Sequence, residues 1–141
     1  MDNKSTVDLL NTLVKNTMID FLDIKFTKVG SDYLEATMPV EPKTMNPANI
    51  LHGGALMALA ESVGSALSFL FIDRETHDIR GLEINGNHVR SASEGIVTAR
   101  ATLVHKGKQT HVSEIRITNN EGLLLNISRM TNMVVDKQVG K

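Results

Sequence analysis

The sequence contains no cysteine at all. This absence excludes disulfide bonds, iron–sulfur clusters, cysteine-ligated zinc and a thiol nucleophile. Basic residues are not in excess either, because 15 Lys and Arg face 16 Asp and Glu and the formal net charge is −1. General nucleic-acid binding depends on a surplus of positive charge against phosphates. We therefore expect no nucleic-acid partner.

Proline is scarce as well, and the three prolines fall between residues 39 and 47. Together with Asn46 and Asn49 they mark one irregular stretch over residues 41–51, which is too short to link two domains. We expect residues 1–141 to form one domain. The polar N-terminus leads into no apolar segment, so we expect no secretory signal and a cytoplasmic location.

Most of the chain has the patterns of strands. Apolar and polar residues alternate in several segments, which indicates strands that are half-buried against a core. The segments before the longest apolar run are residues 24–29 and 33–40, and about four strands are expected from Ile79 onward, including residues 97–103, 111–117 and 123–135. Short turns separate these segments, so consecutive strands should pair antiparallel.

Two segments have the patterns of helices. Apolar residues from Val7 to Met18 recur at helical spacing and predict a short helix. Residues 53–72 are rich in Ala and Leu, lack Pro and carry Glu61 as their only charge. A helix that is apolar almost all round is a membrane span or a core helix, and a charge at mid-bilayer argues against the span. We therefore predict an α+β fold in which an antiparallel sheet wraps around one long buried helix.

The start of this long helix and its single charge form the one constellation that points to chemistry. Gly53 and Gly54 open the helix, where backbone N–H groups lack intrahelical partners and can stabilise a developing oxyanion. A buried carboxylate at Glu61 would suit a general base. Ser65 follows one turn later on the same face. Each feature also has a structural interpretation: a plain helix start, a paired carboxylate and a packing residue.

The segments Leu51–Gly54 and Ala60–Ser62 together resemble the hotdog-fold acyl-CoA thioesterases. The likeness extends in order to residues 21–24, 34–40, 81–85 and 87–92. It is most similar to the hydroxybenzoyl-CoA and 1,4-dihydroxy-2-naphthoyl-CoA hydrolases. The resemblance implies a hotdog fold that hydrolyses an acyl-CoA, in particular an aroyl-CoA, to the free acid and CoA. CoA is then part of the substrate, and no separate cofactor is expected.

The resemblance also implies roles for individual residues. In the family, the residue matching Gly53 donates its N–H to the thioester carbonyl, and the residue matching His52 lines the same spot. The acid matching Glu61 reaches in from the partner subunit, as a nucleophile or as a base for water. The hydroxyl residue matching Ser65 helps to position the water or the carboxylate. The family usually has Gln six residues before the His, touching the thioester; here Asn46 is one methylene shorter and keeps the amide.

CoA binding is implied for Gly81 and for two further segments. These comprise His88, Val89, Arg90 and Ser91, and then His105, Lys106, Gly107, Lys108, Gln109 and Thr110. Arginine and lysine side chains among them suit phosphate recognition. Family members build the active site from two subunits, so we expect a homodimer or a dimer-of-dimers tetramer with shared sites. Sheet edges that pair with a twin favour the same arrangement.

Two other functions stay open at this point. A hotdog acyl-thioester hydratase or dehydratase would use His52 together with Glu61, and a non-catalytic acyl-CoA-binding module would bind without turnover. The five histidines form no i, i+4 pair, so we expect no metal site. We expect no membrane partner, and Met57, Phe69 and the small residues of the long helix are candidates for the acyl pocket.

Overall fold

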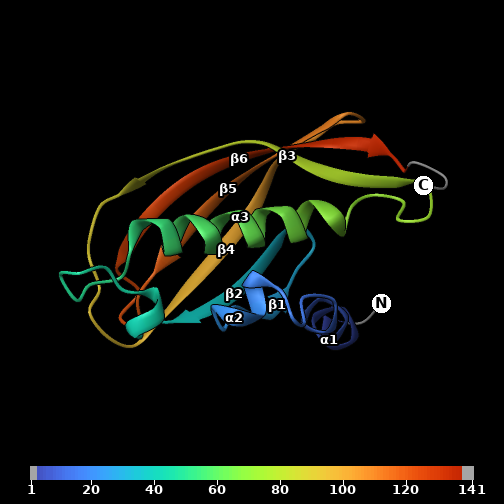
Figure 1. The fold of residues 1–141 in the computed structure, drawn as a ribbon. Coiled ribbons are helices and arrows are strands. Elements are labelled where there is room, and N and C mark those ends of the chain that lie inside the picture. Colours follow the sequence, from blue (N-terminus) through green and yellow to red (C-terminus); the bar gives the residue numbers. More distant parts are fainter. Residues whose placement is uncertain (1–2, 138–141) are drawn as a thin grey trace.

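Six antiparallel strands curve around one long helix in the computed structural model, which describes residues 3–137 (Figure 1). In chain order the elements are α1 (Asn3–Leu13), α2 (Met18–Phe21), β1 (Lys25–Val29), β2 (Tyr33–Pro39), the 3-10 helix η1 (Pro42–Thr44), α3 (Gly53–Phe69), β3 (His77–His88), β4 (Ile96–Lys106), β5 (Thr110–Thr118) and β6 (Leu124–Asp136). The order across the sheet is β1-β2-β4-β5-β6-β3. The expected α+β fold is confirmed, with two strands before the long helix and four after it.

The N-terminal segment forms two helices rather than the single helix expected from its apolar spacing. α1 ends at Leu13, and the chain turns at Asn16, whose φ of 62° is left-handed. Asparagine tolerates this conformation because its short polar side chain can bond locally. The carboxylate of Asp20 stabilises the turn by accepting hydrogen bonds from the N–H of Asn16 (3.1 Å) and from Nζ of Lys15 (2.9 Å).

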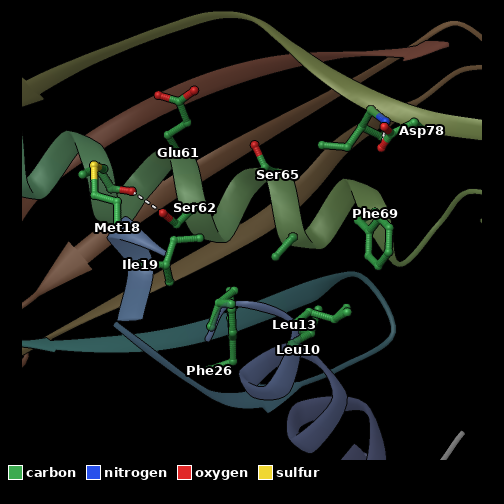
Figure 2. A pocket seen from close by; sticks show the side chains of 14 residues that line it. Leu10, Leu13, Met18, Ile19, Phe26, Glu61, Ser62, Ser65, Phe69 and Asp78 are labelled. Carbon is green, nitrogen blue, oxygen red and sulfur yellow. Dashed lines mark hydrogen bonds between the residues drawn. The ribbon is translucent and has the colours of Figure 1, made fainter. Parts of the chain in front are cut away.

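α3 presents one face to the sheet and leaves another open. Its buried residues are Leu56, Leu59, Ala60, Val63, Gly64, Leu67 and Ser68. Glu61 is exposed in the single chain, so the expected burial of its carboxylate was wrong, because the curved sheet does not cover the side of α3 between β3 and α1. An apolar pocket lies along this open side (Figure 2). No helix within residues 3–137 is long and apolar enough to cross a membrane.

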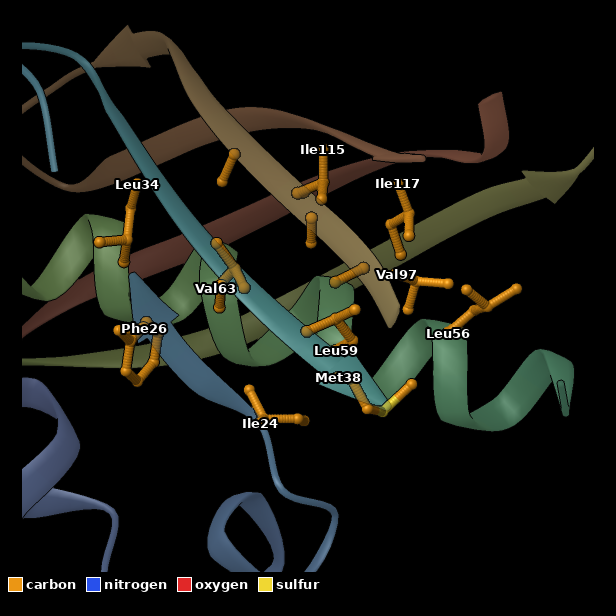
Figure 3. Packing of buried hydrophobic residues seen from close by; sticks show 14 of the residues in the cluster. Ile24, Phe26, Leu34, Met38, Leu56, Leu59, Val63, Val97, Ile115 and Ile117 are labelled. Atoms are coloured by element: carbon orange, nitrogen blue, oxygen red, sulfur yellow. The ribbon is translucent and has the colours of Figure 1, made fainter. Parts of the chain in front are cut away.

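The core lies between the buried face of α3 and the sheet (Figure 3). Leu59 and Val63 of α3 have no exposed surface, and they belong to one cluster with Met38 of β2 and Ile115 of β5, which are equally buried. Every second residue of β2 points into this cluster, as its alternating pattern predicts. Burial of this face orients α3 and thereby directs Glu61 outwards.

β1 and β3 form the two edges of the sheet. β6 is the one strand that pairs with β3 within the described part of the chain. Leu82, in the middle of β3, is 55 % exposed. A strand edge presents N–H and C=O groups that can pair with another strand. The long edge of β3 therefore lies free beside the open side of α3.

Replacing Leu59 by alanine should lower the free energy of unfolding by about 2–5 kcal/mol, because removal of a fully buried side chain leaves a cavity. Leu123→Ala is the matched control, since Leu123 is 46 % exposed and its loss should change stability by less than about 0.5 kcal/mol. Urea denaturation followed by circular dichroism measures both. Equal effects of the two substitutions would contradict this account of the core.

Candidate active site

The first turn of α3 leaves one backbone donor free. His52 caps the helix, because its Nδ1 accepts a hydrogen bond of 2.8 Å from the N–H of Gly54. The N–H groups of Ala55 and Leu56 donate to the carbonyl oxygen of His52 at 2.9 and 3.1 Å. The N–H of Gly53 makes no hydrogen bond within residues 3–137. It lies at the positive end of the helix dipole and can bind a carbonyl oxygen.

His88, at the end of β3, lies against this helix start. A Cβ built on Gly53 would be 2.9 Å from Nε2 of His88, so the ring occupies the space that a side chain at position 53 would need. On the other edge of the ring, Nδ1 of His88 is 3.2 Å from Nδ2 of Asn126. The sequence predicted a CoA contact for His88, and nothing in the sequence pattern indicated its contact with Gly53.

Glu61 and Ser65 lie farther along α3 and point to the same side of the helix (Figure 2). Oε1 of Glu61 would be 3.4 Å from a Cβ built on Gly81, so the carboxylate lies close to the backbone of β3. The hydroxyl of Ser65 donates to Sδ of Met130 at 3.7 Å rather than to Glu61. Glu61 is eight positions after Gly53, which corresponds to about 12 Å along a helix. Within one chain the two groups thus lie more than two helical turns apart.

An apolar pocket of about 480 Å³ lies beside Glu61. Part of its apolar lining comes from α1, α2 and β1, through Leu10, Leu13, Val14, Met18, Ile19 and Phe26. α3 contributes Phe69, as expected, together with small residues such as Ala66. Met57, the other expected residue, lies elsewhere, with its sulfur 3.7 Å from Oγ of Ser128. The contribution of α1 was missed, because its apolar spacing equally indicates a helix that packs on the core.

Asp78 of β3 is a second acidic residue that lines this pocket. Nη1 of Arg80 donates to its carboxylate at 2.6 Å, and the N–H of Ile79 donates at 2.8 Å. These two hydrogen bonds, with that from Arg80 the stronger, hold the pKa of Asp78 below its ordinary value. Asp78 is therefore ionised and paired, whereas Glu61 has no ion-pair or hydrogen-bond partner in the described chain.

Asn46 holds the loop that leads into α3. Its Oδ1 accepts hydrogen bonds from the N–H groups of Ala48 (2.9 Å) and Ile50 (3.4 Å), and its own N–H donates to the carbonyl oxygen of Ile50 at 2.9 Å. Asn49 in the same loop has a left-handed φ of 56°. Oδ1 of Asn46 is thus engaged within the loop, and the amide nitrogen is the part of the side chain that is available to a substrate.

The two segments assigned to CoA lie at opposite ends of the sheet. His88 is opposite Asn126 on β6, and Thr110 is opposite Met133 on the same strand. Asn126 and Met133 are seven positions apart on β6, which corresponds to about 23 Å. Residues 88–91 therefore lie near the start of α3, and residues 105–110 lie near its end. Within one chain the structure does not bring them together.

His105 and His111 lie on the hairpin between β4 and β5, where two histidines on neighbouring strands can lie close to each other. Burial of His111, and then the positive charge of Lys106 and the neighbouring His105, lower the pKa of the His111 imidazole. The part of the chain from residue 3 to 137 holds no group of three or more His, Cys, Asp or Glu side chains arranged for a metal ion. His111 itself is buried, with 2 % of its surface exposed.

Asn46→Ala should accelerate hydrogen exchange of the Ala48 and Ile50 amides by about fivefold, because each loses a hydrogen bond worth about 1 kcal/mol. Asn46→Asp keeps the acceptor oxygen at the same distance from the backbone and should retain the protection. Asn46→Gln moves the oxygen away by one methylene and should behave like alanine. NMR-detected exchange measures this, and unchanged rates in Asn46→Ala would contradict the role in the loop.

Comparison with known proteins matches residues 48–126 to the Thioesterase superfamily. The chain is 44% identical over 132 residues to 1,4-dihydroxy-2-naphthoyl-CoA hydrolase of Escherichia coli, covering 94% of this chain and 96% of the relative. A mutant of thioesterase PA1618 from Pseudomonas aeruginosa superposes with a TM-score of 0.91 at 41% identity, covering 93% of this chain and 94% of the other. For thioesterase HI1161 from Haemophilus influenzae the TM-score is 0.89 at 40% identity, with 92% and 90% covered. The chain therefore belongs to the thioesterase superfamily and is a thioester hydrolase with the hotdog fold.

Proposed function

We propose that the protein hydrolyses acyl-CoA thioesters that carry an aromatic acyl group, and releases the free acid and CoA. The observation that carries the proposal is the free N–H of Gly53 on the same helix as the exposed, unpaired Glu61, which borders an apolar pocket. The N–H can bind the thioester carbonyl oxygen. The carboxylate can act at the carbonyl carbon or on a water molecule.

The helix dipole of α3 assists the chemical step. Negative charge develops on the carbonyl oxygen during attack, and the N–H of Gly53 at the positive end of the helix stabilises it. Glu61 acts in one of two ways. Its carboxylate adds to the carbonyl carbon and expels the CoA thiolate, leaving an anhydride that water hydrolyses, or it takes a proton from a water that adds to the carbon. In both routes the C–S bond breaks, the thiolate gains a proton and one water oxygen ends in the acid.

The remaining predicted residues have supporting roles in this proposal. His52 caps α3 through Nδ1, which keeps the first turn ordered and leaves its Nε2 facing outwards from the backbone. Asn46 orders the preceding loop through Oδ1 and offers its amide nitrogen to the thioester. Ser65 lies on the same side of α3 as Glu61, where a hydroxyl can orient the attacking water (Figure 2).

Two copies of the chain complete each site. Because Gly53 and Glu61 of one α3 are about 12 Å apart, the carbonyl bound at Gly53 is attacked by Glu61 of the partner subunit. Antiparallel pairing of β3 with the β3 of a second copy would join the His88 end of one strand to the His77 end of the other. The resulting homodimer has two shared sites, and a tetramer would contain two such dimers.

The same pairing accounts for the two separated CoA segments. Residues 88–91 of one subunit and residues 105–110 of its partner would approach each other, although they lie at opposite ends of one sheet. Arg90, Lys106 and Lys108 supply positive charge for the phosphates of CoA. CoA thus bridges the two subunits in this proposal.

The pocket beside Glu61 supports an aromatic acyl group. Its volume of about 480 Å³ falls within the usual range for small-molecule sites. Phe26 and Phe69 belong to its lining, and aromatic rings pack favourably edge-to-face or offset against one another. The Escherichia coli relative is named for a dihydroxynaphthoyl-CoA, which is an aroyl-CoA.

Glu61→Gln should lower kcat for CoA release by at least about a thousandfold, since loss of a catalytic carboxylate typically has an effect of this size. The fold should be retained, because Glu61 is exposed in the single chain. Glu121→Gln, which neutralises an exposed carboxylate in the loop before β6, should leave the rate unchanged. A Glu61→Gln protein that is folded and retains most of its activity would contradict the role of this residue.

Thiol release from a panel of CoA thioesters should give higher kcat/KM for benzoyl- and hydroxynaphthoyl-CoA than for acetyl-CoA. The reason is that an acetyl group leaves the apolar pocket unfilled, and each buried methylene-sized group contributes about 0.8 kcal/mol. A preference for acetyl-CoA would contradict the assignment of the pocket to an aryl ring.

A further inference from the structure

We infer that His88 is a second hydrogen-bond donor to the thioester carbonyl oxygen, and that Asn126 and Ser128 hold its ring in the required tautomer. The inference rests on the proposed function, because it concerns the carbonyl that Gly53 is proposed to bind. A residue that only holds CoA would affect substrate affinity. A donor to the carbonyl oxygen affects the chemical step.

The side-chain amide of Asn126 is buried, and two neighbouring residues determine its orientation. Asn126 is fully buried and Ser128 is 3 % exposed. Oγ of Ser128 donates to Oδ1 of Asn126 at 2.7 Å. Sδ of Met57 lies 3.9 Å from Nδ2 of Asn126, and a thioether sulfur can only accept. Both contacts place the NH₂ group of Asn126, rather than its oxygen, towards His88.

The orientation of Asn126 determines the tautomer of His88. Nδ2 of Asn126 lies 3.2 Å from Nδ1 of His88, and an NH₂ group facing a ring nitrogen must donate to it. A neutral imidazole that accepts at Nδ1 carries its proton at Nε2. His88 therefore presents an N–H donor on the edge of the ring that faces the start of α3.

This donor lies within reach of the oxygen that Gly53 would bind. Nε2 of His88 is 2.9 Å from the Cβ position of Gly53. Since a Cβ lies about 2.5 Å from its own backbone nitrogen, the two nitrogens are no more than about 5.4 Å apart. Two donors that bind one oxygen at about 2.9 Å each can be up to about 5.8 Å apart. One carbonyl oxygen can thus accept hydrogen bonds from both.

Glycines make room at both ends of this chain of hydrogen bonds. A Cβ on Gly86 would lie 2.3 Å from Oγ of Ser128 and 3.2 Å from Nδ2 of Asn126. At the other end, a Cβ on Gly53 would displace the ring of His88. Any larger residue at either position would therefore disturb the path from Ser128 to Nε2. The arrangement is built into the packing of β3, β6 and α3.

Three substitutions of His88 test the donor. Gln can place an amide N–H near the position of Nε2, whereas Asn places it near Nδ1 and Ala removes it. Loss of an oxyanion donor typically lowers kcat by about 100-fold or more. We expect His88→Ala and His88→Asn to show such a loss with benzoyl-CoA, and His88→Gln to stay within about tenfold of wild type. Because His88 is exposed, all three variants should fold.

Asn126→Asp tests the positioning role through a pH profile. A carboxylate at this position can only accept a hydrogen bond. Neutral His88 would therefore adopt the tautomer with its proton on Nδ1, and Nε2 would no longer be a donor. The negative charge also favours imidazolium, which carries a proton on both nitrogens. Activity of this variant should therefore survive at low pH, where the imidazolium donates from Nε2, and fall as the pH rises. Neighbouring charged or titratable residues are His52 at the start of α3, Arg90 beyond β3 and the proposed Glu61 of the partner subunit.

Asn87→Asp is the matched control, since it adds the same charge one residue from His88 without touching this chain of hydrogen bonds. It should keep the wild-type profile. A His88→Ala protein with raised KM and unchanged kcat would overturn the inference in favour of a CoA contact. Equal kcat values for His88→Gln and His88→Asn would overturn it as well. Absence of thioester hydrolysis in the wild-type protein would instead overturn the proposed function on which the inference rests.

Discussion

The rise of one helix governs the whole site. α3 carries both the free N–H of Gly53 and the carboxylate of Glu61, and a helix keeps two residues eight positions apart at about 12 Å. Catalysis at a single carbonyl needs both groups within about 3 Å of the reacting atoms. A rigid helix cannot bend to meet this requirement. We therefore propose that the two groups of one helix belong to two different sites, each completed by a second copy of the chain.

The packing of the core determines how this helix is presented. The face of α3 with Leu59 and Val63 is held by the sheet, so the opposite side must face outwards. β3 borders that open side and keeps a free edge, so a partner strand can pair there beside the open helix face. The loop held by Asn46 and the cap formed by His52 then order the first turn of α3. The buried core, the free edge of β3 and the loop before α3 together determine where the N–H of Gly53 lies.

Much of the fold could be predicted from local patterns, because alternation and helical spacing record which residues face a core. Such patterns predict the strands and the long helix that begins at Gly53, whose first turn has free backbone N–H groups. The exposure of Glu61 could not be predicted from the sequence. Small apolar residues occur on every side of α3, so the sequence does not show which side of the helix the sheet leaves uncovered. The contact of His88 with Gly53 joins residues 35 positions apart and depends on the pairing of β3 with β6. The spacing of residues along the chain does not predict such a contact.

Subunit complementation tests the shared site most directly. Glu61→Gln and Gly53→Val each damage a different half of every site, so each pure protein should be inactive. The two variants are dissociated, mixed in equal amounts and reassociated, so that half of the dimers contain one subunit of each kind. In each such mixed dimer, one site combines an intact Gly53 with an intact Glu61. We expect the mixture to recover about a quarter of wild-type activity, because half of the dimers then hold one intact site out of two. A mixture of folded, exchanged subunits that stays as inactive as its parents would contradict it.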